Sequence, residues 1–266
     1  MELLNHPLTI NEVLVRTHLM TSISEVGDKD FTPISYGSGF FVYDKGRSIF
    51  VTADHTLHLD DYNSDQGRVW RDYQILIFNN IDGSDISTIQ TPVGGFYFME
   101  NLDLRELNDE VYKGKPIDIA ACVLNEKSCK YKFMTQKFKD EEGNIFQWPI
   151  LAFGRESFGK PEKDKKCLVF GQVHTQVKGI QLRYDNVTYE LDYISSHGDF
   201  HLFHTQDIVR YEDWGGLSGT PIIDEEGKCV AVLTNVLEGT NSVWGISIKR
   251  LETLLDIINF EKNREC

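Results

Sequence analysis

The chain has 266 residues, of which 41% are hydrophobic, so it can bury a substantial core within one or two domains. Its 27 basic and 41 acidic residues give a formal net charge of −14, which disfavours binding to the phosphates of nucleic acids. No leader and no apolar run of membrane-spanning length is visible, and the five cysteines are odd in number without C-x-x-C spacing, so we expect a cytoplasmic protein without disulfides or membrane contact.

The first predicted element is a short helix near the start of the chain. Thr9 and Glu12 have the spacing of a capping box and precede the apolar residues 13–15. Short strands follow, rich in β-branched and aromatic residues, and turn signals such as Asp44-Lys45-Gly46 and Asp82-Gly83 separate them. Many short strands with few helices favour an all-β barrel or sandwich.

A polar stretch divides the strands into two groups. Residues 80–116 have mixed character and predict a hairpin with a surface insertion, and residues 125–146 predict a linker. The predicted parts of the chain are therefore 1–124, 125–146 and 147–266. At the end of the third part, four apolar residues fall on one face at helical spacing and predict a C-terminal helix: Leu251, Leu254, Leu255 and Ile258.

Three patterns carry chemistry, and each lies at the end of a predicted strand. His55 closes the pattern V-T-A-D-H after an apolar strand, and Asp118 opens the apolar strand D-I-A-A, where a carboxylate needs a partner. Ser218 lies in G-G-L-S-G-T-P, whose glycines let the backbone turn tightly and aim N–H groups at one point. The order of the three residues along the chain is itself informative, because subtilisin-like enzymes and α/β-hydrolases use the same residue types in other orders.

In the order His, Asp, Ser, these patterns resemble the trypsin/chymotrypsin-like (S1-type) serine peptidase family. The elements T-A-x-H, D-I-A and G-x-S-G-x-P are most similar to its bacterial cytoplasmic and HtrA-like branch, and G-S-G-F-F-V at residues 37–42 resembles the element before the family's histidine. The resemblance covers residues 17–260. It implies two six-stranded antiparallel β-barrels, the first carrying His55 and Asp118 and the second Ser218, with the site in the cleft between them.

The resemblance also implies roles for these residues. Ser218 is the nucleophile, His55 the general base and acid, and Asp118 the group that orients the imidazole. The N–H groups of Gly216 and Ser218 form the oxyanion hole. The implied activity is that of a serine endopeptidase, which needs no metal or organic cofactor and binds a protein or peptide substrate.

Further residues receive roles by alignment with the family. Thr234 corresponds to a serine whose hydroxyl supports the aspartate. Asn235 and Val236 belong to the strand that pairs with the substrate, and Val236 narrows the specificity pocket. Glu212 and Asp213 lie where the floor of that pocket forms, and a carboxylate there would select substrates with Lys or Arg. A solvated acidic loop is the alternative interpretation of that pair.

Leu217 departs from the family, which has Asp or Asn before the serine. In relatives activated by cleavage, that Asp pairs with the new N-terminus, so we expect no activation of that kind here. Leu217 also keeps two alternatives open: a catalytically silent protein acting as a binding module, and a protease that requires a regulatory protein partner. A metal-dependent hydrolase is a third alternative, because His197, His201 and His204 lie near Asp199. Residues three apart face opposite sides of a strand, which disfavours it.

Overall fold

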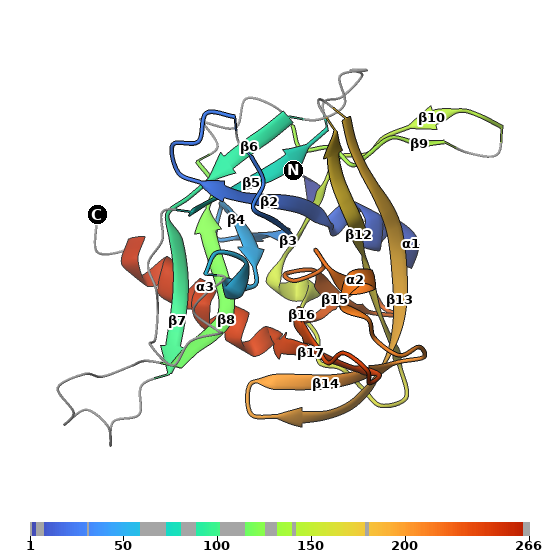
Figure 1. The fold of residues 1–266 in the computed structure, drawn as a ribbon. Helices are drawn as coiled ribbons and strands as arrows, with labels where there is room; N and C mark the ends of the chain where they lie inside the picture. The colour runs from blue at the N-terminus through green and yellow to red at the C-terminus, as the bar shows by residue number, and fades with distance from the viewer. Residues whose placement is uncertain are drawn as a thin grey trace.

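The computed structural model shows a mostly β chain with three α-helices in the part that it describes (Figure 1). The N-terminal helix α1 (Ile10–Thr17) is confirmed, together with its capping box. The Glu12 N–H donates to Thr9 Oγ1 at 3.3 Å, and the Thr9 N–H donates to the Glu12 carboxylate at 2.9 Å. The described residues are 2–3, 8–30, 32–58, 73–80, 89–101, 115–125, 132–139, 142–178 and 181–262.

The first sheet is curled and is formed mainly by the N-terminal half of the chain. Its strands follow the order β6-β5-β2-β3-β4-β8-β7, and the short strand β11 pairs in parallel with β3 and with β1. The strands are β1 (Glu2–Leu3), β2 (Leu19–Glu25), β3 (Ser35–Asp44), β4 (Arg47–Thr52), β5 (Tyr73–Asn79), β6 (Ile89–Val93), β7 (Phe96–Asn101), β8 (Lys115–Val123) and β11 (Leu151–Phe153).

The prediction of two closed barrels is wrong for this first sheet. In the described part of the chain, β6 pairs with β5 and β7 pairs with β8, so no hydrogen-bonded ladder joins the two edges. Only Gly94 and Gly95 separate these two strands, and Gly95 has a φ of +73°. The chain therefore passes from one edge of the sheet to the other through a glycine corner, which needs no pairing between the edges.

The second sheet is a closed barrel of six antiparallel strands, as the sequence predicts. Its strand order is β12-β13-β14-β17-β16-β15, and its interior is filled by buried apolar side chains such as Val169, Phe203 and Leu233. The strands are β12 (Lys166–Lys178), β13 (Gln181–His197), β14 (Phe200–Thr205), β15 (Pro221–Asp224), β16 (Cys229–Val236) and β17 (Ser242–Ser247).

The segment between the two sheets contributes to both the surface and the first sheet. The hairpin of β9 (Phe138–Lys139) and β10 (Ile145–Phe146) projects from the body within the predicted linker (Figure 1). Strand β11 follows the linker in sequence but pairs with the first sheet, so the second barrel begins at Lys166. Several predicted features lie outside the described residues: the turn at residues 82–83, most of the insertion within 80–116, part of the linker, Cys129 and Cys266.

The C-terminal helix α3 (Ile248–Lys262) is confirmed, and it joins the two halves. Its four predicted apolar residues are at most 1% exposed. It packs against β7 and β8 of the first sheet and β16 and β17 of the second (Figure 1). These residues share one buried cluster with Ile119 and Val232, so the two sheets are held together by a common core. That core fixes the strand ends that carry the site.

Candidate active site

His55 is positioned by a single turn of 3₁₀ helix, η1 (Asp54–Thr56), that starts two residues after β4 ends. The Thr56 hydroxyl donates to the Ala53 carbonyl at 2.7 Å and lies 3.2 Å from the Thr52 hydroxyl. Thr56 is buried, and its methyl group lies close to Gly37 of β3. These contacts of the Thr56 hydroxyl fix the end of β4 next to His55.

Asp118 approaches His55 from the neighbouring strand β8, where it is 7% exposed. The prediction that Asp118 opens this strand is wrong, because β8 begins at Lys115. The pairing of β8 with β7 shifts between Phe98 and Met99, so Asp118 and Ile119 have no partner in that ladder. A bulge of this kind can redirect a side chain next to a functional site. Here it accompanies a carboxylate that faces the adjacent 3₁₀ turn.

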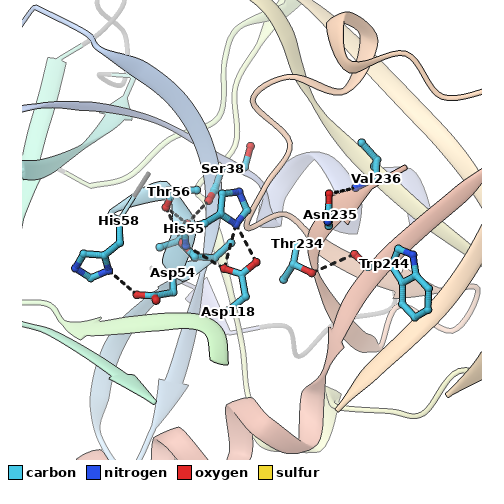
Figure 2. Close-up of polar contacts among 12 residues, drawn as sticks. Ser38, Asp54, His55, Thr56, His58, Asp118, Thr234, Asn235, Val236 and Trp244 are labelled. Atoms are coloured by element: carbon cyan, nitrogen blue, oxygen red, sulfur yellow. Dashed lines mark hydrogen bonds and ion pairs between the residues drawn. The ribbon is translucent and has the colours of Figure 1, made fainter. Parts of the chain in front are cut away.

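The contact between Asp118 and His55 has three components. The His55 backbone N–H donates to Asp118 Oδ1 at 2.9 Å, and His55 Nδ1 lies 3.0 Å from Oδ1 and 2.8 Å from Oδ2 (Figure 2). Since a carboxylate accepts hydrogen bonds, Nδ1 carries the proton, and Nε2 of the neutral ring is left as an acceptor. This is the tautomer that a general base requires.

The pKa of His55 is raised above its ordinary value. Burial by itself lowers the pKa, but the charge of Asp118, its hydrogen bond to the ring and the charge of Asp54 together outweigh burial. The imidazolium form is therefore favoured by the carboxylates around it. A catalytic base needs a stabilised protonated form, because it must hold a proton during the reaction.

A second carboxylate–histidine pair lies beside the first and was not anticipated from the sequence. Asp54 is fully buried, and its Oδ1 lies 2.8 Å from His58 Nδ1 (Figure 2). The sequence signal for this pair was the spacing of four positions between Asp54 and His58 across a turn. This pair ties Asp54, at the start of η1, to His58, two residues after η1 ends, and so supports the position of His55.

Two consecutive tight turns position Ser218: the first ends at Leu217, just before it, and the second contains it. In the first, Gly215 has φ −59° and ψ 125°, Gly216 has φ +95°, and the Leu217 N–H donates to the Trp214 carbonyl at 3.2 Å. These angles are those of a type II turn, which requires a residue that tolerates positive φ at its third position. In the second turn, Gly219 has φ +92°, and the Thr220 N–H donates to the Leu217 carbonyl at 3.0 Å.

The two turns leave a pair of backbone donors free. In the described part of the chain, neither the Gly216 N–H nor the Ser218 N–H has a hydrogen-bond acceptor. Both residues line one pocket together with His55. Two unpaired N–H groups beside a serine hydroxyl are what an oxyanion hole needs.

The same pocket brings the nucleophile candidate and the base candidate together. Ser218 and His55 both line it, from the second barrel and the first sheet respectively. The hydrogen bonds among the described residues include the link from His55 to Asp118, but not one from Ser218 Oγ to His55 Nε2. Such contacts are often long in the absence of substrate and tighten when substrate binds. The other lining residues are Tyr211, Trp214, Gly215, Leu233, Thr234, Asn235 and Val236.

Leu217 anchors the turns in the second barrel. Its side chain is fully buried in the barrel core, and it fits because Gly171 of β12 has no side chain: a Cβ there would lie 2.2 Å from Leu217 Cδ2. Apolar packing thus holds the turn before Ser218 against the core of the second barrel. The expectation that this chain is not activated by cleavage stays a prediction.

Leu217→Asp is expected to lower kcat by about 10²–10³-fold, the effect of losing an oxyanion donor. An unpaired carboxylate is costly in this core, so the turn would leave its position. Leu217→Met, which nearly conserves volume, is the matched control and is expected to stay within about tenfold of wild type. Near-ultraviolet circular dichroism of both variants would report whether the barrel is intact. A folded Leu217→Asp with wild-type kcat would contradict the anchoring role.

The structure places two groups of predicted pocket residues against other partners or outside the pocket lining. The Thr234 hydroxyl donates to the Trp244 carbonyl at 3.4 Å, at a shift in the pairing of β16 with β17, and makes no hydrogen bond to Asp118 (Figure 2). Glu212 and Asp213 lie on α2 (Tyr211–Trp214), but neither is among the described residues that line the pocket. Asp213 lies instead 3.7 Å from His174 Nε2. Glu212 is exposed and the Asp213 side chain is 44% exposed, which agrees with the alternative interpretation of a solvated acidic pair.

The remaining candidate groups are engaged elsewhere. His197 Nε2 and His201 Nδ1 each lie 2.8 Å from a serine hydroxyl, and Asp199 pairs with Arg250. No group of three or more potential metal ligands occurs among the described residues. Cys167 is buried, and burial raises the pKa of its thiol to about 12, which makes it a poor nucleophile. No described helix has the length and apolar character needed to cross a membrane.

No protein-family model matches this sequence, and no curated protein matches it. Among solved structures, the chain is similar to the serine endoprotease from Yersinia pestis, at 10% sequence identity and a TM-score of 0.48. The similarity covers 95% of this chain and 67% of that one. What this chain does is therefore inferred from its own residues and their geometry.

Proposed function

We propose that this protein is a serine endopeptidase that acts through an acyl-enzyme intermediate. The observation that carries the proposal is the hydrogen-bonded pair of Asp118 and His55, which faces the same pocket as Ser218. The contact with Asp118 places the proton on His55 Nδ1 and makes Nε2 the acceptor nitrogen of the ring, and the turns around Ser218 supply two N–H donors that are unpaired among the described residues. The motifs that resemble the trypsin/chymotrypsin-like family support the same assignment.

In the proposed reaction, Ser218 Oγ attacks the scissile carbonyl carbon while His55 Nε2 takes the hydroxyl proton. The carbonyl oxygen becomes an oxyanion, held by the N–H groups of Gly216 and Ser218. His55 then gives its proton to the leaving amine, and an ester on Ser218 remains. Water hydrolyses this ester with His55 again as base, and Asp118 stabilises the imidazolium in both halves of the reaction.

A silent or partner-activated state is the main alternative, and the turn geometry weighs against it. A change between type I and type II at Gly215 and Gly216 reverses the peptide between them, and with it the direction of the Gly216 N–H. The angles observed are those of type II, and that N–H is unpaired. A type II turn that leaves the Gly216 N–H unpaired supports an enzyme that is ready to bind substrate.

The substrate is proposed to be a protein or peptide bound as an extended strand. Residues 234–236 of β16 line the pocket, and they lie beyond the last residue that pairs with β15, Val232. Among the described residues, this edge of β16 therefore has no neighbouring strand there. A peptide can pair with such an edge through its main chain, and side-chain pockets then provide specificity.

The pocket is expected to select apolar residues before the cleaved bond. Its walls include Trp214, Leu233 and Val236, and no lining residue among those described carries a carboxylate. In a panel of peptide anilides that differ only at the residue before the anilide, Leu or Phe is expected to give kcat/KM at least about tenfold above Lys, because nothing pairs with the ammonium group. Val236→Gly should shift the preference towards larger side chains. A preference for Lys or Arg in wild type would refute this specificity.

A fluorophosphonate probe tests the activity itself, because it reacts with serines activated by a neighbouring base. Intact protein is expected to bind one probe per chain, and mass spectrometry of the digested adduct should place it on Ser218. Mapping of the sites cleaved in a cell lysate would then define the substrates. Absence of labelling on folded, intact protein would support a binding module instead.

A further inference from the structure

Ser38 of β3 is a buried residue of the first sheet that binds the nucleophile loop of the second barrel. It is fully buried, and its hydroxyl donates to the Gly216 carbonyl at 2.6 Å. Its backbone N–H donates to the Ser218 carbonyl at 2.8 Å. Its own carbonyl accepts from the Thr52 hydroxyl at 2.7 Å. One residue thus contacts both residues whose N–H groups form the proposed oxyanion hole.

These contacts hold two peptide groups of the loop at both of their ends. In the peptide after Gly216, the oxygen is bound by Ser38 and the N–H by the Trp214 carbonyl. In the peptide after Ser218, the oxygen is bound by the Ser38 N–H, and the Gly219 N–H donates to the Leu233 carbonyl at 2.8 Å. The loop is therefore fixed between the first sheet and the second barrel.

The approach of the loop to Ser38 is close enough to require glycine. A Cβ on Gly219 would lie 2.1 Å from the Ser38 carbonyl oxygen and 2.5 Å from Thr52 Oγ1. The backbone of the loop therefore sits directly against β3 and β4, with no room for a side chain between them. Small changes in Ser38 are transmitted to the turn because no flexible group separates the two.

We propose that Ser38 is a positioning residue, whose hydroxyl holds the Gly216 turn in the orientation that presents its N–H to the oxyanion. This inference rests on the proposed function, and it adds a residue of the first sheet to the machinery of the second barrel. The hydroxyl touches no reacting atom. It acts on the transition state through the Gly216 carbonyl, so its removal affects kcat rather than substrate binding.

The test compares Ser38→Ala with Ser22→Ala in the full chain. Ser22 lies on the adjacent strand β2, is equally buried, and its hydroxyl has no hydrogen-bond partner in the described part of the chain. Ser38→Ala is expected to lower kcat on a peptide anilide by about tenfold, less than the loss of a donor because the donor is loosened and not removed. KM is expected to change less than twofold, and Ser22→Ala to match wild type in both constants.

A peptide boronic acid provides the second measurement, because boron forms a tetrahedral adduct with a serine oxygen and resembles the transition state. Its inhibition constant should rise by about the same factor as kcat falls in Ser38→Ala. Ser38→Cys keeps the size of the side chain but has a much weaker donor, so it should change both quantities in the same direction. It replaces Ser38→Ala if thermal unfolding shows that Ser38→Ala does not fold.

The outcomes separate this inference from the proposed function. If wild type reacts with fluorophosphonate at Ser218 but the Ser38 variants match Ser22→Ala in kcat and boronic acid affinity, the positioning role is wrong and the activity stands. A rise in KM with unchanged kcat would also overturn the role, since it would indicate a general effect on substrate binding. If folded wild type neither reacts with the probe nor cleaves peptides, the proposed function fails, and this inference fails with it.

Discussion

Ser218→Ala is expected to lower kcat on a peptide anilide by about 10⁴–10⁶-fold. The variant lacks the oxygen that forms the acyl-enzyme, while the free N–H groups of the loop and the pocket remain. Any residual rate would come from those groups alone. Peptide binding should be retained, because the strand edge of β16 does not depend on the serine hydroxyl.

Ser195→Ala is the matched control for this experiment. Ser195 of β13 lies 2.8 Å from His197 Nε2, so it belongs to a serine–histidine contact of the same chemistry, away from the pocket. Its removal should leave kcat unchanged within about twofold, as is usual for a partly exposed residue outside the site. The two variants purified in parallel would also expose any contaminating protease. Equal activity of Ser218→Ala and wild type would rule out Ser218 as the nucleophile.

Asp118→Asn is expected to lower kcat by about 10⁴-fold. The amide can donate to the ring as well as accept from it, so it no longer forces the proton onto Nδ1, and His55 Nε2 ceases to be a dependable acceptor. Asp54→Asn is the comparison, because Asp54 also raises the pKa of His55 but hydrogen-bonds His58. That variant should lose less than about tenfold, since the His55 tautomer is kept.

The pH dependence distinguishes the electrostatic from the tautomeric contribution of Asp118. His55 has a raised pKa, so its imidazolium form persists to higher pH, and kcat/KM should fall as pH drops through that raised value. The midpoint in wild type is expected above about 6.5, the ordinary value for histidine. Asp118→Asn should move it downward, and Asp54→Asn should move it downward by less. A midpoint in Asp118→Asn equal to that of wild type would contradict the pairing.

The local elements followed from local sequence patterns. The capping box at Thr9 and Glu12 was sufficient to predict α1, because both partners lie within one turn. The apolar spacing in residues 251–258 was sufficient for α3, because helical periodicity is a property of the segment itself. The glycines at 216 and 219 signalled tight turns for the same reason, and both have positive φ.

Features that depend on distant segments were predicted less well. The prediction that the first sheet closes into a barrel was wrong. Closure depends on which edge strands meet, and a Gly94-Gly95 corner replaces their pairing. Thr234 and Asp213 lie against partners that sequence alignment does not reveal, the Trp244 carbonyl and the His174 ring. The contribution of Ser38 was missed for a similar reason: its hydroxyl binds a carbonyl 178 positions away.

The sequence by itself determined that the chain is mostly β, that His55, Asp118 and Ser218 follow one another in a recognisable order, and that glycines frame the serine. Those properties belong to residue types and their spacing. Only the tertiary structure decided that Asp118 meets the His55 ring, that Leu217 packs in the core of the second barrel, and that β3 holds the serine loop. The reason is physical: a hydrogen bond or a buried contact depends on atoms within a few ångströms, and a linear sequence does not specify which distant atoms the fold brings that close.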